Sequence, residues 1–536
     1  MVSTMHSVIL ALSLSVLVHR GLFIRGEWHL QAPAIFGGHV FAFLLLLVRQ
    51  HLIHRPFGEV AVPAAAYLFG LLAGISVYRM YFHRLRAFPG PRLAALSKVW
   101  HVWKCRDSRG HHVLESWHQE YGSFVRTGPN EITIFHPAAY EVMDGPRNQN
   151  TRSDWYDLLY PRISSIFTRE KAVHDARRKM WDQALSISSL KVYYERMAAQ
   201  VRVLESIVAD HGEKPLLVND LMYWFAFDNM GDFGFGHDFG MLRERRPVDG
   251  AVYMRSAISL LGPFGPAIWI PRIAFAFIPG VWRVRHWFKM LEFSDSCMDE
   301  RMKSGEGDGH LDLASTFIAH HKAAGANKLA RQMLSGDTAT MLVAGSDTTA
   351  PSLILLLYFL ARYPEHAAKI QRELHGLDCA DIRALSALPH LTATIHESMR
   401  LLPAVPTFSS RVVGPQGVTI DGTFIPGGTK ICAPRYSIGR LEAAYEQPDN
   451  FIPERWYSRP ELVKDKRAFA PFGVGRMSCV GKNLAMAQLR LVAAALLSKY
   501  HIRFARGERN GEAVERDLRD QLTANPGNLV LMFEKR

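Results

Sequence analysis

The first 87 residues carry their hydrophobic positions in long continuous runs instead of an amphipathic pattern. The runs are Met5–Val18, Ala32–Val48 and Val60–Val77, and only the last approaches the roughly 20 residues that span a bilayer. The first run also resembles the core of a signal peptide, but no early basic cluster precedes it and no small-residue cleavage site is evident. The pattern therefore predicts a membrane leader with up to three apolar spans.

The pattern changes after the leader to helical periodicity with short alternating runs. It predicts helices over Asp337–Arg362, Glu365–Leu374, Leu391–Leu401 and Lys482–Tyr500, and strands with turns within Val418–Ile431. We therefore expect a mainly α fold with small β-sheets.

A short proline-containing segment divides the leader from this region. Phe88–Arg92 reads FPGPR, and its two prolines and one glycine cannot continue a helix. No linker or repeat interrupts the rest, and the irregular stretch Lys303–His310 is interpreted as a surface loop. We expect an anchor over residues 1–87 and one domain over residues 88–536.

Charge and cysteine content narrow the classes of partner. The chain has 63 basic and 50 acidic residues, a net charge of +13, which suits nucleic acid, anionic lipid or an acidic protein. Residues 1–92 hold eight arginines and two glutamates, and Arg79, Arg84, Arg86 and Arg92 follow the third apolar run directly. This placement favours a membrane over nucleic acid and puts the domain on the cytosolic side.

The cysteine spacing and the absence of a phosphate-binding loop motif argue against a disulfide framework, a zinc site and a nucleotide site. The five cysteines show neither a disulfide framework nor a CxxC zinc pattern. No GxGxxG or Walker loop follows a predicted strand, so no nucleotide site is indicated.

One cysteine lies in an unusual loop, APFGVGRMSCVGKNLA, just ahead of a predicted helix. The thiolate of Cys479 is a soft ligand suited to iron, and a helix N-terminus stabilises it. Gly473, Gly475 and Gly481 allow the backbone to approach a flat ligand, and Arg476 could reach an acidic substituent of that ligand. The alternative is an inert buried thiol.

Phe472, Gly475, Arg476, Cys479 and Gly481 together read FxxGRxxCxG. This pattern resembles the haem-binding loop of cytochromes P450. The resemblance implies that fold, with haem b held by the Cys479 thiolate as axial iron ligand and the other four residues around the cofactor.

A second motif, ESMR, places Glu397 and Arg400 three residues apart. Such a pair is commonly a solvated ion pair on a helix surface. It also resembles the ExxR pair of the same family, and Arg455 in FIPERW resembles the third member of the family's buried Glu-Arg-Arg network. The role implied is structural support of the cysteine loop, so loss of Glu397 should prevent haem incorporation.

A third motif, AGSDTTAP, lies within a long apolar helix, where it could be tolerated polarity in a core helix. Threonine hydroxyls bond back to helical carbonyls, and Pro351 clashes with the carbonyl of Asp347, so we expect a kink. The resemblance implies that Asp347 and Thr348 form the acid-alcohol pair that orders water and supplies protons. Ala344 and Gly345 would leave room for oxygen.

Candidate contacts to the haem propionates are weaker. His174 and Arg178 in HDARRKMW, and Arg411 in SSRVV, resemble family positions. Many members have Trp where His174 stands, so whether His174 or Arg177 bonds a propionate is left open. A surface helix is the alternative reading of this segment.

The resemblance implies a membrane-tethered monooxygenase of the endoplasmic reticulum whose domain faces the cytosol. It would use O₂, electrons from NADPH-cytochrome P450 reductase with cytochrome b5 as a further donor, and a hydrophobic small-molecule substrate, without nucleic acid. The PERW motif and the leader resemble fungal secondary-metabolism members. The alternatives are a reductase-independent isomerase or dehydratase and a non-catalytic haem sensor, neither of which needs the acid-alcohol pair.

The substrate pocket should be lined by five segments without fixed motifs. They are Asp154–Ile166, Phe225–Phe239, Leu342–Ser346, Pro403–Ser409 and Thr523–Pro526.

Overall fold

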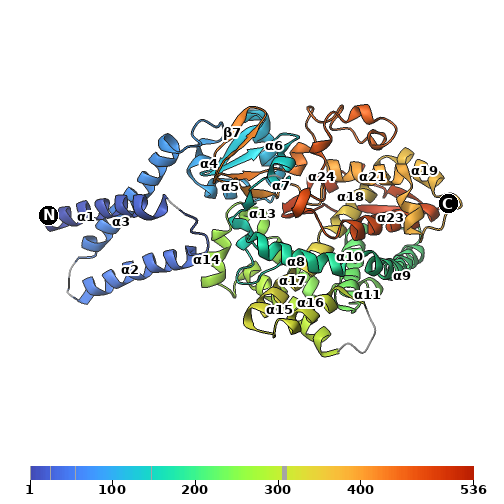
Figure 1. Cartoon of the computed structure of the whole chain (residues 1–536), viewed down its shortest axis with the longest axis horizontal. Coiled ribbons are helices and arrows are strands. Elements are labelled where there is room, and N and C mark those ends of the chain that lie inside the picture. The colour runs from blue at the N-terminus through green and yellow to red at the C-terminus, as the bar shows by residue number, and fades with distance from the viewer. Residues whose placement is uncertain (1, 25, 53, 55, 147, 305–310) are drawn as a thin grey trace.

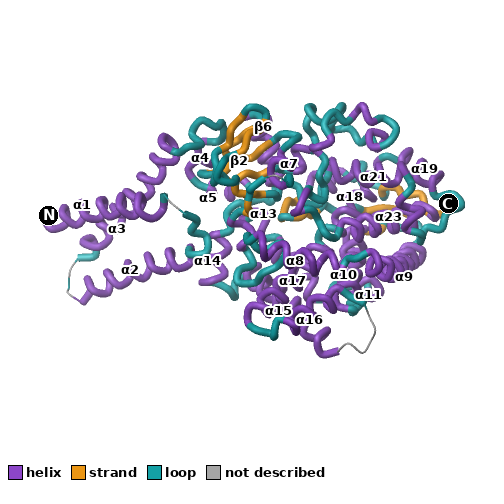
Figure 2. The backbone as a smooth tube through the Cα atoms, viewed as in Figure 1, coloured by secondary structure: helices purple, strands orange, loops and turns teal. Residues whose placement is uncertain are grey.

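The structure is a computed structural model that describes residues 2–24, 26–52, 54, 56–146, 148–304 and 311–536. It is mainly helical with small β-sheets, which confirms the predicted fold class (Figures 1 and 2). The two termini lie at opposite ends of the long axis, and the leader extends away from the domain (Figure 1). Residues 305–310 of the expected loop Lys303–His310 lie outside the described residues.

The helices that build the domain and leader have the following bounds. They are α1 Val2–Val18, α2 Ala32–Leu52, α3 Gly58–Val77, α4 Arg92–Leu96, α5 Lys98–Lys104, α6 Gly110–Tyr121, α7 Ala139–Asp144, α8 Lys171–Ala184, α9 Ile187–His211, α10 Val218–Phe235, α11 Met241–Glu244, α12 Asp249–Ile258, α13 Leu261–Phe264, α14 Trp269–Phe277, α15 Trp282–Ser304, α16 Leu313–Ala323, α17 Lys328–Ser346, α18 Thr349–Arg362, α19 Pro364–Glu373, α20 Ile382–Ser386, α21 Pro389–Leu401, α22 Arg435–Ile438, α23 Lys482–Lys499 and α24 Glu512–Arg516.

The strands are short and form four sheets. They are β1 Phe124–Gly128, β2 Glu131–Ile134, β3 Thr151–Arg152, β4 Leu216–Leu217, β5 Ser410–Val412, β6 Val418–Ile420, β7 Thr423–Ile425, β8 Lys430–Cys432, β9 Tyr500–Phe504, β10 Arg519–Gln521, β11 Thr523–Asn525 and β12 Val530–Lys535. The largest sheet has the order β1-β2-β8-β5-β3, and β10 and β11 form a separate antiparallel hairpin.

Among its described residues, the leader contains three helical segments long and apolar enough to cross a membrane, Met5–Phe23, Ala32–Leu52 and Gly58–Phe82. Their surfaces are unlike those of a soluble protein, because large apolar side chains such as Phe41 and Phe69 are about 70% exposed. Helices α1 and α3 pack closely, since a Cβ on Gly70 would lie 2.4 Å from Ser15 Oγ.

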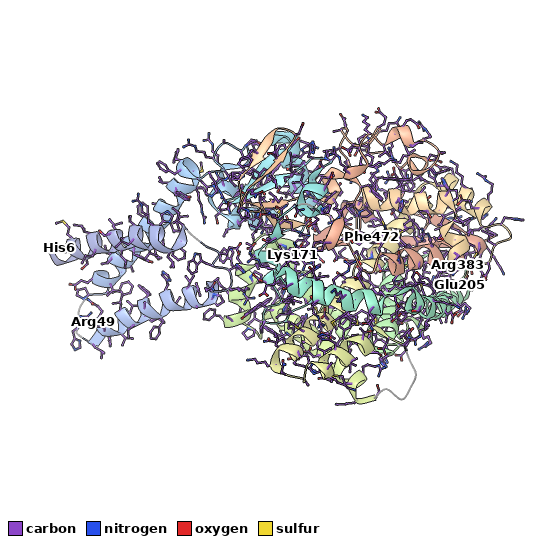
Figure 3. All side chains as sticks on the ribbon, viewed as in Figure 1. His6, Arg49, Lys171, Glu205, Arg383 and Phe472 are labelled. Carbon is purple, nitrogen blue, oxygen red and sulfur yellow. The ribbon has the colours of Figure 1, made fainter. Side chains whose placement is uncertain are left out.

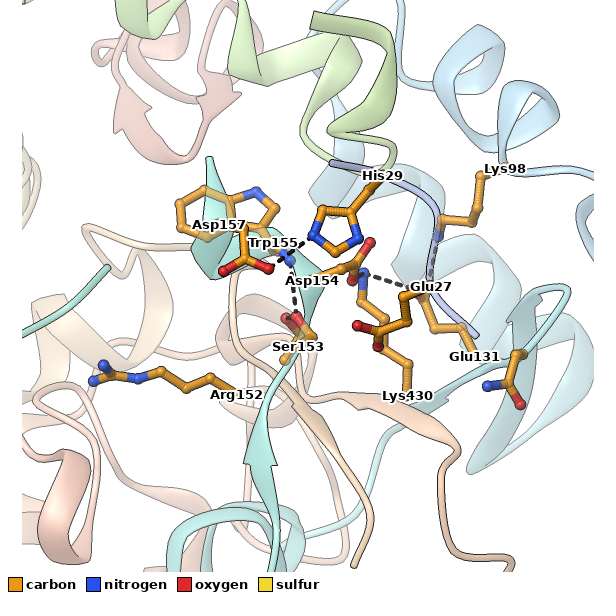
Figure 4. A network of polar contacts seen from close by, with 12 residues as sticks. Glu27, His29, Lys98, Glu131, Arg152, Ser153, Asp154, Trp155, Asp157 and Lys430 are labelled. Carbon is orange, nitrogen blue, oxygen red and sulfur yellow. Dashed lines mark hydrogen bonds and ion pairs between the residues drawn. The ribbon is translucent and has the colours of Figure 1, made fainter. Parts of the chain in front are cut away.

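The connection between α1 and α2 docks on the domain. Nε2 of His29 lies 2.8 Å from an Asp157 carboxylate oxygen, and Arg169 donates to Glu27 at 2.5 Å. Figure 4 shows His29 and Asp157 facing each other beside the segment that contains Ser153 and Trp155. The leader is therefore joined to the domain by side-chain contacts as well as by the chain itself.

The domain has one large helical core and a smaller core against the five-stranded sheet. Helices α17 and α18 cross the helical core, and although the segment Lys328–Arg362 is apolar enough for a membrane span, 72% of its most apolar window is buried within the protein. The predicted single helix over Asp337–Arg362 is divided at Asp347 and Thr348, where the two helices meet.

Candidate active site

The cysteine loop, residues 470–481, folds back on itself before α23. The backbone N–H of Cys479 donates to the carbonyl oxygen of Phe472 at 2.7 Å. Gly475 has φ of +61°, and a Cβ there would lie 2.2 Å from the Asp144 carbonyl oxygen at the end of α7. Glycine is required at this position both by the left-handed backbone and by the close approach of α7.

Cys479 is exposed in this loop. Burial raises the pKa of this thiol, while the backbone N–H of Gly481 and the nearby cations Arg178, Arg435 and Lys482 oppose that shift. These groups favour the thiolate, which is the form that binds a metal.

Helix α17 is mostly buried but has an exposed position near its C-terminal end. Ala344 is exposed and Thr348 is half-buried, whereas their neighbours Leu342 and Ser346 are buried. The Thr348 hydroxyl donates to the Ala344 carbonyl oxygen at 2.8 Å. Threonine back-bonding of this kind bends helices. The break leaves the small side chain of Ala344 exposed and the side chain of Thr348 half-buried.

Asp347 turns away from Thr348 at the break. Its carboxylate is buried and accepts a short hydrogen bond from the hydroxyl of Thr523 in β11. Burial raises the pKa of Asp347 to about 6, and the Thr523 hydroxyl and Arg255 partly offset this. The two residues expected to form a pair are therefore adjacent in the chain but have different partners.

Helix α8 lies between α17 and the cysteine loop. Arg177 is buried and donates to Asp337 of α17, with Nε at 2.7 Å. Arg178, on the next position, donates from Nη1 to the carbonyl oxygen of Ser478 at 2.6 Å. Figure 3 places Lys171 at the start of this helix and Phe472 of the loop in the middle of the domain. Consecutive arginines thus join α8 to α17 and to the cysteine loop.

His174 and Arg476 share one carboxylate. Nδ1 of His174 lies 3.0 Å from Asp175 Oδ1, and Arg476 Nη1 donates to Asp175 Oδ2 at 3.1 Å. Burial lowers the pKa of His174. Arg177 is paired with Asp337, so of the two residues left open for a propionate contact, His174 is the one beside the loop.

Arg411 is held by other groups. It makes a bidentate pair with Asp144, at 2.6 and 2.8 Å, and donates to the hydroxyl of Tyr156 at 2.6 Å. Asp144 also carries the carbonyl oxygen against which Gly475 packs. Arg411 therefore lies near the loop, and it must exchange a partner if it is to hold a propionate.

Glu397, Arg400 and Arg455 form a fully buried network. Arg400 donates to both oxygens of Glu397 at 2.8 and 2.9 Å, and Arg455 Nε donates to Glu397 Oε1 at 2.9 Å. The remaining guanidinium donors bond to backbone carbonyl oxygens, including those of Gly439 and Glu446. A buried network of this kind is stable only while every partner is present.

The route from this network to the cysteine loop was not predicted from the sequence. Trp456 donates from its indole N–H to Glu397 Oε2 at 2.9 Å, and its ring packs 4.3 Å from that of Phe469, just before the loop. Arg435 adds a second support by donating to the carbonyl oxygen of Ala470 at 3.1 Å. In the sequence, the only indication of this link was that Trp456 directly follows Arg455.

These residues fit a haem. The loop offers an exposed cysteine, α17 offers an exposed small residue at Ala344, and the cation Arg178 of α8 bonds to the loop. Gly481 is open toward the sulfur, since a Cβ there would lie 3.9 Å from Sγ. A soft sulfur donor beside glycine and alanine suits a flat iron cofactor.

The fold and this site define a haem-thiolate protein, and comparisons with known proteins give the family. A profile of the cytochrome P450 family matches residues 89–532. The chain belongs to the cytochrome P450 family, its cofactor is haem iron ligated by cysteine, and it is a monooxygenase, as the resemblance predicted.

Two curated relatives are similar over most of the chain. "Cytochrome P450 monooxygenase sthD" of Phaeosphaeria nodorum is 35% identical, with 83% of this chain and 94% of the relative covered. "Tryprostatin B 6-hydroxylase" of Aspergillus fumigatus is 34% identical, with 84% and 81% covered. Among solved structures, the cytochrome P450DA heme domain aligns with a TM-score of 0.66 at 18% identity over 80% of this chain and 94% of its own, which shows the shared fold.

Proposed function

We propose that this chain is a membrane-tethered, reductase-dependent haem-thiolate monooxygenase that oxidises a hydrophobic small molecule in fungal secondary metabolism. The observation that carries the proposal is that Cys479 of the loop and Ala344 beside the α17 break are both exposed, with Thr348 half-buried at the break. The relatives named as a monooxygenase and a hydroxylase support the oxidative chemistry.

The bound haem supplies oxygen activation by iron with a thiolate ligand. The chain's own residues would hold and surround it: Cys479 would ligate the iron, Phe472, Gly475, Arg476 and Gly481 would shape the loop, and Arg178 with His174 would bond the propionates, with Arg411 as a further donor. On the other side of the cofactor, the Thr348 hydroxyl oxygen would hold a water, and Asp347 would be the acid that supplies protons. Glu397, Arg400 and Arg455 keep the loop in place.

The leader and the charge support the location and partners. Three candidate spans precede a domain whose first residues are arginine-rich, which favours anchoring in the endoplasmic reticulum membrane with the domain in the cytosol. A net positive charge outside the leader suits an acidic electron donor such as NADPH-cytochrome P450 reductase, with cytochrome b5 as a second donor.

Replacing Thr348 with alanine should uncouple NADPH use from product formation. The hydroxyl donates its proton to the Ala344 carbonyl oxygen, which leaves its oxygen free to accept from a water. Loss of that water should lower coupled product formation by about tenfold or more. The share of consumed NADPH recovered as oxidised product should fall accordingly in membranes containing reductase, with the haem spectrum unchanged. Undiminished product without reductase would favour the isomerase or dehydratase alternative.

The matched control is Thr349→Ala. The Thr349 hydroxyl makes the same back-bond, to the Gly345 carbonyl oxygen at 2.8 Å, but its side chain is buried. Coupling should stay at the level of the unmodified protein in this variant. Equal uncoupling in both variants would mean that helix geometry, and not the exposed hydroxyl, controls the reaction.

Replacing Thr523 with valine should move the pH dependence of coupling. The Thr523 hydroxyl lowers the pKa of Asp347 against the larger effect of burial, which leaves it at about 6. Without that donor the carboxylate is protonated at higher pH, so the inflection in coupled product formation should shift upward from about pH 6. Thr523→Ser restores a hydroxyl and should restore the inflection. An inflection that stays in place in the valine variant would exclude Asp347 as its origin.

A further inference from the structure

A cavity of about 90 Å³ lies apart from the cysteine loop. It is bounded by α5, the start of α6, the segment after α13, the chain just before β5 and the β10–β11 hairpin. Trp155, Phe408, Leu261 and Leu522 give it an apolar wall. An apolar wall with a few polar groups is typical of a small-molecule pocket.

The cations that line the cavity are already neutralised. Lys98 donates to Glu131 at 2.6 Å, and Lys430 lies 3.5 Å from Glu131 and 3.1 Å from Asp154 (Figure 4). His101 is buried beside Lys98, and burial followed by the Lys98 charge lowers the pKa of His101 to about 3, so the ring is neutral. This end of the cavity therefore presents paired charges.

Asp520 of β10 is different. It is 5% exposed, and its carboxylate accepts a hydrogen bond from the Thr407 hydroxyl at 2.6 Å. The backbone N–H of Leu522 also donates to it. Among the described residues no lysine, arginine or histidine pairs with this carboxylate. A buried carboxylate without a cation carries an uncompensated desolvation cost, which a cationic ligand would relieve.

Gly110 packs against this carboxylate. A Cβ at Gly110 would lie 3.0 Å from Asp520 Oδ2, so a larger residue at this position would crowd the carboxylate. Burial also raises the pKa of Asp520 to about 6, so at neutral pH the group is mainly ionised.

The same hairpin connects the cavity to the helix break. Its turn residue Leu522 has φ of +80° and lines the cavity, although a branched residue rarely adopts that conformation. The next residue, Thr523, donates to Asp347 at the break. Leu522 in the cavity wall is therefore followed directly in the chain by Thr523, which bonds to Asp347, one of the residues proposed for catalysis.

We propose that Asp520 is the recognition group for a protonated amine on an otherwise apolar substrate, with Thr407 orienting the carboxylate. This proposal rests on the proposed function, because it assigns the cavity to the substrate of that monooxygenase. The ammonium N–H donates to the carboxylate, and Trp155, Phe408 and Leu522 contact the apolar body. A charge-assisted hydrogen bond in a desolvated pocket gives strong selectivity between a cation and a neutral analogue of the same shape.

The test uses the full-length, haem-loaded protein in lipid nanodiscs and a matched pair of probes. The amine is N,N-dimethyl-4-phenylbutylamine, and the neutral analogue is 5-methylhexylbenzene, which replaces the nitrogen with CH. Dissociation constants come from isothermal titration calorimetry of the haem-loaded protein, with empty nanodiscs as the blank. The measured quantity is the ratio of the two constants, compared between variants, so that partition of the probes into lipid cancels.

In Asp520→Asn the preference for the amine should fall about tenfold or more, while affinity for the neutral probe stays that of the unmodified protein. Asp517→Asn removes an exposed carboxylate three residues away, paired with Arg516, and should leave the preference unchanged. Thr407→Val keeps the charge and should reduce the preference partly.

An unchanged ratio in Asp520→Asn, with the neutral probe still bound, would overturn the proposal. A protein that lacks the thiolate-haem spectrum would instead contradict the proposed function. The two failures are therefore distinguishable in one set of samples.

Discussion

Replacing Cys479 with alanine should abolish the red-shifted absorbance band that the reduced, carbon monoxide-treated protein gives when thiolate ligates its haem. The sulfur is the exposed donor of the loop, and the Gly481 N–H together with the cations around it stabilises the thiolate. No other cysteine among the described residues lies in the loop, so the loss should be complete. The measurement is a difference spectrum of the full-length protein in membranes.

Cys379→Ala is the control for this result. Cys379 is a half-buried free thiol between α19 and α20, away from the loop. The band should be retained in that variant at the level of the unmodified protein. A thiolate band that survives in Cys479→Ala would show that the ligand has been assigned to the wrong residue.

Replacing Glu397 with glutamine should strongly reduce haem content. The substitution keeps the shape of the side chain but leaves Arg400 and Arg455 without a counter-charge at a site where all three residues are fully buried. Breaking a buried ion pair in this way costs about 3–5 kcal/mol, which is a large part of the stability of a typical domain. The ratio of haem to protein after purification measures the effect.

Two further variants separate the network from general destabilisation. Glu461→Gln removes an exposed carboxylate near Arg459 and should leave haem content unchanged. Trp456→Phe removes only the indole donor to Glu397 and should lower haem content less than Glu397→Gln does. If all three variants retain haem fully, the network does not support the cysteine loop.

The largest features of the fold were predictable because they depend on local pattern. The predicted helix over Leu391–Leu401 lies within α21, and the one over Lys482–Tyr500 matches α23 to within one residue. The strands expected within Val418–Ile431 are β6, β7 and the start of β8. Periodicity reports which face of a segment is buried, and that is a property of neighbouring residues.

The site was only partly predictable. Glu397, Arg400 and Arg455 were expected to meet, and they do, but the link through Trp456 to Phe469 was not expected. The hydrogen bond from the Thr523 hydroxyl to the Asp347 carboxylate, 176 positions away in the chain, was not expected either. Such a contact leaves no pattern in a single sequence, because nothing local distinguishes one threonine hydroxyl from another.

The sequence by itself determined the cofactor class, the family resemblance and the apolar leader, since each depends on residue types at fixed short spacing. Tertiary structure alone decided that α17 and α18 separate at Asp347, that the α1–α2 connection docks on the domain, and that Asp520 is buried without a cation. The physical reason is that desolvation and pairing are set by what the fold brings within a few ångströms. Those neighbours come from distant parts of the chain, so only the folded molecule defines them.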